Sequence, residues 1–271
     1  MNKKEIDKFD VVVIGSDEVF NCTQNAEWGF STQLLGKGIN SKKVITYAAS
    51  CGFTTLEKLS ELGLTEEVIE CLSNISEFSV RDKNTYNFVE VLTDKKPIMS
   101  LDPVLIGDFK GEITNELKEE DYIVIYGYDN RINDEKEIET IKKFAKKNKL
   151  KTVGVGFYQR WCDKNVLVEP FELLEYFQKA KFIITDTFHG TIFSIKLNKP
   201  FATIIRDSNR EKLFYLLERF GFEAREVTNI NKLEEVLTSN INFTKSNLII
   251  EEETLKSHEY LKNSLRLQSN E

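Results

Sequence analysis

The sequence predicts an α/β fold with parallel β-sheets, divided between two domains. The chain has 271 residues, of which 41% are hydrophobic, and a single core usually splits above about 250 residues. Short continuous apolar runs alternate with segments of helical period, and this alternation is typical of parallel sheets covered by helices on both faces. Size and alternation together favour two α/β units.

Seven short runs rich in β-branched residues are the predicted strands. Their continuous apolar character indicates strands that are buried on both faces. They comprise residues 11–14, 44–48, 78–80, 122–126, 152–156, 182–185 and 201–205.

Two of the segments between these strands have a clear amphipathic period. We interpret both apolar stripes as helix faces that pack on the core, and not as cofactor-binding surfaces. The first stripe contains Ile138, Ile141, Phe144 and Ala145, and the second contains Leu213, Leu216, Leu217 and Phe220.

A polar segment at residues 107–121 carries two glycines and no apolar period, so it is predicted to cross between the domains. We assign the first domain to residues 1–110 and the second to residues 119–271. The second domain ends in a helix that carries Leu255, Leu261 and Leu265. We expect this closing helix to pack back across the first domain.

The charge of the chain argues against several classes of partner. The formal net charge is -7, and such a surface repels nucleic acid and anionic membranes at long range. We therefore expect no nucleic-acid partner. An anionic substrate must instead meet a local basic pocket.

The four cysteines lie far apart in the sequence and form no CxxC pair, so neither a zinc site nor any other metal site is predicted. No run approaches the roughly 18 apolar residues of a membrane-spanning helix, and residues 1–10 are charged where a signal peptide is apolar. We therefore expect a cytoplasmic protein without an integral membrane segment.

The segment at residues 181–205 forms a complete βαβ unit with a polar turn after its first strand. This turn lies at the amino terminus of the following helix, where free N–H groups and the helix dipole attract anions. We predict a phosphate site at Thr187, Phe188 and Gly190, with His189 as a proton donor near neutral pH. The alternative is a histidine that only caps the helix.

A second polar turn, Gly15-Ser16-Asp17, directly follows the first predicted strand. A carboxylate in this position can face a ligand crevice, where Asp17 can accept the proton of an attacking hydroxyl. The alternative is that Asp17 caps the next helix.

Three further residues follow predicted strands and are candidate ligand contacts. Arg81 supplies a fork suited to carboxylate or phosphate, although an ion pair with its neighbour Asp82 is the alternative. Asp102 is held extended before a proline, and Arg160 lies beyond the fifth strand. We predict that both face the crevice, with a plain turn and a solvated loop as the alternatives.

Five motifs occur in order between about residues 10 and 206: GSDEVFN, YAASCG, SVRD, LDPVL and TDTFHGTIFSIKLNKPFA. Together they resemble the polysaccharide pyruvyl transferase family. The resemblance implies a GT-B-like arrangement of two Rossmann-like domains with the active site in the cleft between them. Gly15, Ser16 and Asp17 match the GSD turn of the family. His189 and Gly190 match its HG element, where the histidine contacts the donor.

The chain departs from the family in three respects. Members commonly begin several tens of residues earlier, with a first strand and a glycine-rich turn, so a first domain truncated at its start is one interpretation. Many members carry arginine two positions before the histidine, where this chain has Thr187. That positive charge is then either absent or supplied by another arginine. Glu18 and Phe20 replace a glutamine and a tryptophan, and these changes preserve the turn.

The resemblance implies a transferase that moves the enolpyruvyl group of phosphoenolpyruvate onto sugar hydroxyls of a polysaccharide or its lipid-linked precursor. The product is a pyruvate ketal, and the setting is exopolysaccharide and cell-envelope biosynthesis. His189 is the expected acid, Asp17 the expected base, and Arg81 a donor-binding fork. The implied partners are phosphoenolpyruvate and a glycan, with no further cofactor.

Other features of the function stay open at this point. Peripheral association with membrane-bound glycan assembly is compatible with the resemblance, and the oligomeric state is not predicted. Two alternative functions also remain. One is a GT-B glycosyltransferase that uses a nucleotide sugar, and the other is a non-catalytic family member that acts as a binding subunit.

Overall fold

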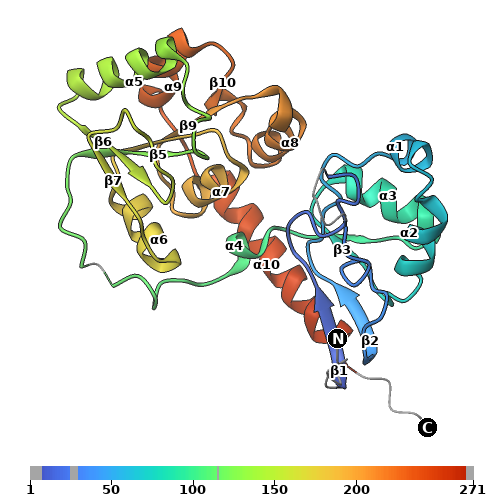
Figure 1. The fold of residues 1–271 in the computed structure, drawn as a ribbon. Coiled ribbons are helices and arrows are strands. Elements are labelled where there is room, and N and C mark those ends of the chain that lie inside the picture. The colour runs from blue at the N-terminus through green and yellow to red at the C-terminus, as the bar shows by residue number, and fades with distance from the viewer. Residues whose placement is uncertain (1–7, 25–29, 115, 267–271) are drawn as a thin grey trace, which may run out of the picture. The chain divides into compact units, whose positions relative to one another are not determined.

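The computed structural model describes residues 8–24, 30–114 and 116–266 (Figure 1). The chain forms two compact units, each of which contains helices and parallel strands. Unit 1 comprises Met1–Ile106 and Glu251–Glu271, and unit 2 comprises Gly107–Ile250. The predicted α/β class with parallel sheets is confirmed.

Parallel strands run through unit 1 in the order β1-β2-β3-β4. Their bounds are β1 Phe9–Ile14, β2 Ser41–Thr46, β3 Ser79–Val80 and β4 Ile98–Met99. β1 pairs with β2 and β3 pairs with β4, while isolated parallel bridges from Ile45 to Glu77 and from Ala49 to Val80 join β2 to β3. The carboxyl ends of these strands therefore lie along one edge.

The helices of unit 1 are α1 Leu56–Glu61, α2 Thr65–Leu72, α3 Lys83–Thr93 and α4 Pro103–Ile106. Asp82 caps α3, because its carboxylate accepts hydrogen bonds from the backbone N–H of Thr85 at 2.8 Å and from the Ser50 hydroxyl at 2.7 Å. This capping fixes the point at which the chain leaves β3 and turns into α3. Buried Phe20, Leu72 and Phe88 belong to the core of this unit.

Unit 2 is built on a six-stranded parallel sheet with the order β10-β9-β8-β5-β6-β7. The strand bounds are β5 Tyr122–Tyr126, β6 Lys151–Val155, β7 Lys164–Val166, β8 Phe182–Thr185, β9 Phe201–Ile204 and β10 Glu226–Val227. The chain first adds strands on one side of β5 and then returns to add β8 on its other side. The strand order therefore reverses between β5 and β8, which is where ligands bind in open α/β sheets.

Helices cover both faces of this sheet (Figure 1). α5 (Glu135–Lys147) and α9 (Leu233–Thr238) pack on one face with the buried residues Ile123 and Ile184. α6 (Pro170–Lys179) and α7 (Phe188–Lys196) contact each other, and α7 packs on β8 and β9.

The predicted apolar stripes are confirmed as core faces. Ile141, Phe144 and Ala145 of α5 are buried and Ile138 is half-buried. The four stripe residues of α8 (Arg210–Phe220) are all buried. Most charged side chains of both helices face solvent, which is the usual reason for an amphipathic period. Glu137 of α5 is the exception, because its side chain is 12% exposed and pairs with Arg206.

The last helix, α10 (Thr244–Ser264), begins in unit 2 and ends in unit 1. The Tyr260 hydroxyl donates to the backbone oxygen of Thr46 at 2.8 Å, and Leu261 packs with Tyr47. The sequence placed residues 119–271 in one domain, whereas these contacts group the end of the chain with unit 1. Of the three leucines expected to pack on the first domain, Leu255 and Leu265 are 68% and 47% exposed. Within the described ranges, no helix combines the length and apolar composition that crossing a membrane requires.

Candidate active site

The carboxyl edge of unit 1 brings together three of the predicted site residues. Asp17 follows β1, Arg81 follows β3 and Asp102 follows β4. Arg81 Nη2 lies 2.7 Å from Asp17 Oδ1, and Arg81 Nη1 lies 3.0 Å from Asp102 Oδ2. Because parallel strands end at one edge, residues far apart in the sequence converge here on a single guanidinium.

The three side chains differ sharply in exposure, and this difference suggests separate roles. The side chains of Arg81 and Asp102 are only 6% and 3% exposed, whereas that of Asp17 is 65% exposed. Arg81 therefore forms a buried link between a buried and an accessible carboxylate. Its fork orients Asp17, and its predicted contact with an anionic donor stays a prediction.

The backbone of the Gly15-Ser16-Asp17 turn explains why these residue types stand there. Gly15 has a φ of +149°, and a Cβ atom at this position would lie 2.0 Å from the backbone oxygen of Tyr47. Asp17 has a φ of +63°, a conformation that aspartate tolerates better than most residues. The residues after Asp17, up to Gln24, form turns and not a helix, so Asp17 is not a helix cap.

The predicted phosphate turn of unit 2 lies where the order of the strands reverses. It follows β8 directly and leads into α7. The Thr187 hydroxyl accepts a hydrogen bond from the backbone N–H of Gly190 at 2.9 Å and so caps α7. His189 is half-buried in the first turn of α7, with its ring centroid 6.1 Å from that of Phe193. The cap of α7 is thus Thr187 and not His189.

A buried carboxylate that the sequence did not identify as a site residue precedes this turn. Asp186 is fully buried, and its Oδ2 lies 3.1 Å from Arg131 Nε and 3.4 Å from Arg206 Nε. Burial raises the pKa of Asp186, while the two guanidinium groups act in the opposite direction. The Asn209 side chain also donates to the Asp186 backbone oxygen at 2.7 Å.

The cluster joins the segments that follow three different strands and so fixes the Thr187–Gly190 turn. Arg131 follows β5, Asp186 follows β8 and Arg206 follows β9. Arg206 also makes two hydrogen bonds of 2.7 Å to the carboxylate of Glu137 on α5. A buried carboxylate so paired fixes the backbone that carries Thr187 and His189. The signal available in the sequence was position: Asp186 and Arg206 directly follow predicted strands, and Arg131 lies in the loop after another.

The remaining predicted contacts are accessible to different degrees. Phe188 is half-buried, with its ring edge-on to His189 at 5.7 Å between centroids. Arg160 is exposed in the loop after β6. Both lie beyond carboxyl ends of strands of the unit 2 sheet, as predicted from their positions.

Replacing Gly190 with alanine should destabilise the protein by about 1–3 kcal/mol, the usual cost of overpacking a core. A Cβ atom at Gly190 would lie 2.1 Å from Thr185 Oγ1 and 2.8 Å from a ring carbon of Tyr126. Thr185 is fully buried, and its hydroxyl bonds to the Tyr126 backbone oxygen at 2.6 Å, so it has little room to move. Urea denaturation gives the change in the free energy of unfolding.

The matched control for this prediction is Gly111→Ala. A Cβ atom added at Gly111 meets nothing within 4 Å, so this variant should unfold like the wild type. Equal stability of the Gly190→Ala and Gly111→Ala variants would contradict the close packing of the turn.

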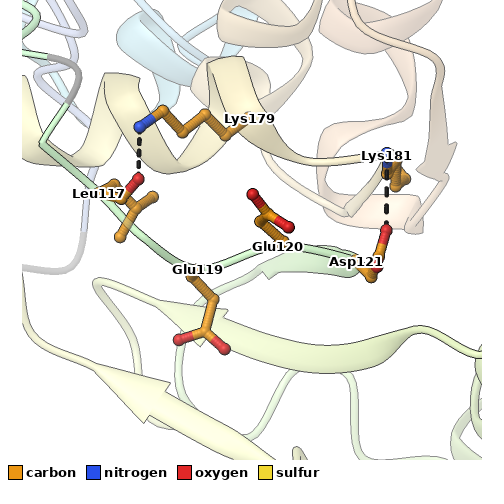
Figure 2. Close-up of a pocket in the computed structure, with 6 residues that line it drawn as sticks. All are labelled: Leu117, Glu119, Glu120, Asp121, Lys179 and Lys181. Atoms are coloured by element: carbon orange, nitrogen blue, oxygen red, sulfur yellow. Dashed lines mark hydrogen bonds and ion pairs between the residues drawn. The ribbon is translucent and has the colours of Figure 1, made fainter.

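A separate cavity of about 410 Å³ lies at the opposite edge of the unit 2 sheet (Figure 2). Asp121 and Lys181, which line it, immediately precede β5 and β8, and they form an ion pair at 3.5 Å. The Lys179 ammonium donates to the Leu117 backbone oxygen. None of the predicted site residues lines this cavity, and its lysines are already engaged with the protein. It is therefore not the predicted phosphate site.

The described residues contain no group of three or more histidine, cysteine, aspartate or glutamate side chains placed to hold a metal ion.

Comparisons with known proteins give one family and two distant structural likenesses. The structure of Arabidopsis thaliana UGT89C1 complexed with UDP-L-rhamnose is 11% identical, with a TM-score of 0.42 over 95% of this chain and 67% of that chain. The same protein complexed with quercetin is also 11% identical, with a TM-score of 0.41 over 95% of this chain and 66% of that chain. A search of curated proteins found no match.

The polysaccharide pyruvyl transferase family matches residues 1–208. This range includes the Gly15–Asp17 turn, Arg81, Asp102 and the Thr187–Gly190 turn, and its extent confirms the predicted family and the predicted enzyme class, a transferase. The chain belongs to the polysaccharide pyruvyl transferase family.

Proposed function

We propose that this protein transfers the enolpyruvyl carbons of phosphoenolpyruvate to two hydroxyls of a glycan and forms a cyclic pyruvate ketal. The family match supports the reaction class. The observation that carries the donor site is the position of the Thr187–Gly190 turn, at the carboxyl edge where the strand order of unit 2 reverses. Backbone N–H groups at such a helix terminus suit a phosphate.

The proposed reaction begins with a proton that adds to the methylene carbon of phosphoenolpyruvate and makes the neighbouring carbon electrophilic. A sugar hydroxyl bonds to that carbon and loses its proton, after which the bond between carbon and the phosphate oxygen breaks. A second hydroxyl of the glycan closes the ketal, and its proton leaves with the phosphate. One phosphoenolpyruvate and two hydroxyls thus yield one ketal and inorganic phosphate.

In this proposal His189 supplies the proton to the methylene carbon, because imidazole exchanges protons near neutral pH. Asp17 accepts the proton of the first attacking hydroxyl. Its accessible carboxylate, held on one side by buried Arg81, supports this role. The carboxylate of Asp186 stays buried and acts only by holding the turn.

The donor proposal predicts that phosphoenolpyruvate raises the melting temperature, because a ligand that binds only the native state stabilises it by mass action. At a concentration of about 100 times Kd the gain in the free energy of unfolding is about 2.7 kcal/mol. Thermal denaturation with phosphoenolpyruvate, pyruvate or inorganic phosphate would measure it. We expect the largest shift with phosphoenolpyruvate, which carries both anionic groups.

Thermal denaturation with UDP-sugars added to this set of ligands discriminates the alternatives. A shift with UDP-sugars and none with phosphoenolpyruvate would favour a glycosyltransferase. A well-folded protein that responds to neither would favour a non-catalytic binding subunit, since Thr187 stands where many family members carry an arginine.

A further inference from the structure

The carboxyl edge of unit 2 carries a group of accessible aromatic rings next to the candidate catalytic turn. Tyr128 follows β5 and is 48% exposed, and Tyr158 follows β6 and is 65% exposed. Phe157, which directly precedes Tyr158, is half-buried and less exposed than either tyrosine. We refer to Tyr128, Phe157 and Tyr158 as the aromatic shelf.

The shelf is continuous with His189 through a chain of packed rings. Successive centroid distances are 5.0 Å from Tyr128 to Phe157, 5.5 Å from Phe157 to Tyr126, 6.1 Å from Tyr126 to Phe193 and 6.1 Å from Phe193 to His189. These spacings are those of favourable aromatic pairs. The rings therefore connect the outer loops after β5 and β6 to the turn where the proposed donor binds.

Hydrogen bonds between the two loops hold the shelf in place. The backbone N–H of Tyr158 donates to Asp129 Oδ1 at 2.8 Å, and the buried side chain of Gln159 donates to the Gly127 backbone oxygen at 2.7 Å. The Trp161 indole donates to the Ile132 backbone oxygen at 2.8 Å. A surface fixed in this way loses little conformational entropy when a ligand binds.

The shelf also has a polar rim. The Arg131 guanidinium carbon lies 5.5 Å from the centroid of Tyr128, and Asp129 and Arg160 are exposed beside the rings. Accessible rings bordered by charged groups of both signs suit a ligand that has an apolar face and a polar edge. A pyranose ring has this character, since one face presents C–H groups while its hydroxyls point outward.

We propose that the aromatic shelf binds a pyranose ring of the glycan acceptor by stacking, with the exposed side chains of Asp129 and Arg160 available for its hydroxyls. This inference rests on the proposed function, because family membership is the reason to expect a glycan at all. It adds the location of an acceptor subsite, on the same unit as His189. Tyr128, the outermost ring of the chain, is exposed and lies near both Phe157 and Arg131, so it is the ring to test first.

Saturation-transfer NMR with methyl glycosides of glucose, galactose, mannose, N-acetylglucosamine and N-acetylmannosamine tests the shelf directly. We expect at least one glycoside to receive saturation at the C–H protons of one ring face. Tyr128→Ala should weaken this binding about tenfold, and Tyr158→Ala should also weaken it. Phe171→Ala is the matched control, because Phe171 is 44% exposed on α6 and its ring packs near Phe109 instead.

The proposal would be overturned if the wild type transferred saturation to no glycoside, or if the wild type and Tyr128→Ala bound glycosides equally. UMP is measured in the same way, and Tyr128-dependent binding of UMP without binding of any glycoside would also overturn it. The melting shift with phosphoenolpyruvate, measured on the same proteins, separates this proposal from the proposed function. If phosphoenolpyruvate did not raise the melting temperature of the wild type but a glycoside still bound, the proposed donor would be wrong and the proposed acceptor subsite would stand. A normal shift without glycoside binding would count against the shelf alone.

Discussion

Replacing His189 with alanine should lower turnover about 10²–10⁴-fold, the usual contribution of a well-placed general acid. The imidazole lies in the first turn of α7, at the helix terminus where the phosphate is proposed to bind. Alanine there removes the proton donor while Thr187 still caps the helix through Gly190. The fold should therefore survive, and the loss should appear in kcat more than in KM.

The assay follows inorganic phosphate released from phosphoenolpyruvate with a panel of disaccharides as acceptors. His189→Gln, which keeps a hydrogen-bonding side chain but no acid, should be as impaired as His189→Ala. The matched control is His258→Ala, because His258 is the other histidine of the chain and is exposed on α10. Full activity of His189→Ala would remove the histidine from the proposed reaction.

Replacing Arg81 with alanine should destabilise the protein by about 3–5 kcal/mol, because removal of one partner leaves a buried charge uncompensated. Asp102 is the group left behind, with a side chain that is only 3% exposed and loses its ion pair at 3.0 Å. Asp17 is affected differently, since its accessible carboxylate keeps its contact with water. Urea denaturation measures the change in the free energy of unfolding. A loss of this size would show that Arg81 stabilises unit 1 in addition to orienting Asp17.

Two controls identify the cause of this destabilisation. Lys37→Ala breaks the exposed ion pair with Glu70 at 2.9 Å and should cost no more than about 1 kcal/mol. The double variant Arg81→Met with Asp102→Leu removes both charges together, and it should recover much of the stability lost in Arg81→Ala. If Arg81→Ala were no less stable than Lys37→Ala, the buried pair would not matter to the fold.

Most of the agreement between predicted and observed strands follows strand length. The exception is β3, which has two residues but continues the apolar run that begins at Phe78. Each of the seven predicted runs overlaps an observed strand, because a short apolar run rich in β-branched residues is unlike a surface loop in composition. The strands that the sequence did not reveal are β4, β7 and β10, which are two or three residues long. So few residues carry no period of their own, and such strands form because a neighbouring strand offers hydrogen-bonding partners.

The candidate site was predictable as separate residues and not as an assembly. Asp17, Arg81 and Asp102 each follow a predicted strand, and that position was visible in the sequence. Their mutual ion pairs depend on strand order, which local sequence does not encode. The same holds for Asp186, which becomes a site residue only because β5 and β9 bring Arg131 and Arg206 beside it.

The sequence by itself determined the α/β class, the long strands, the amphipathic helices and the motifs by which the family is identified. These features arise from local composition and period, so they can be read from neighbouring residues. The tertiary structure alone decided that Arg81 is enclosed by two carboxylates, that Thr187 and not His189 caps α7, and that Tyr128 meets Phe157. Each of these contacts joins residues whose proximity depends on how strands and turns pack, because burial and pairing are properties of the folded chain.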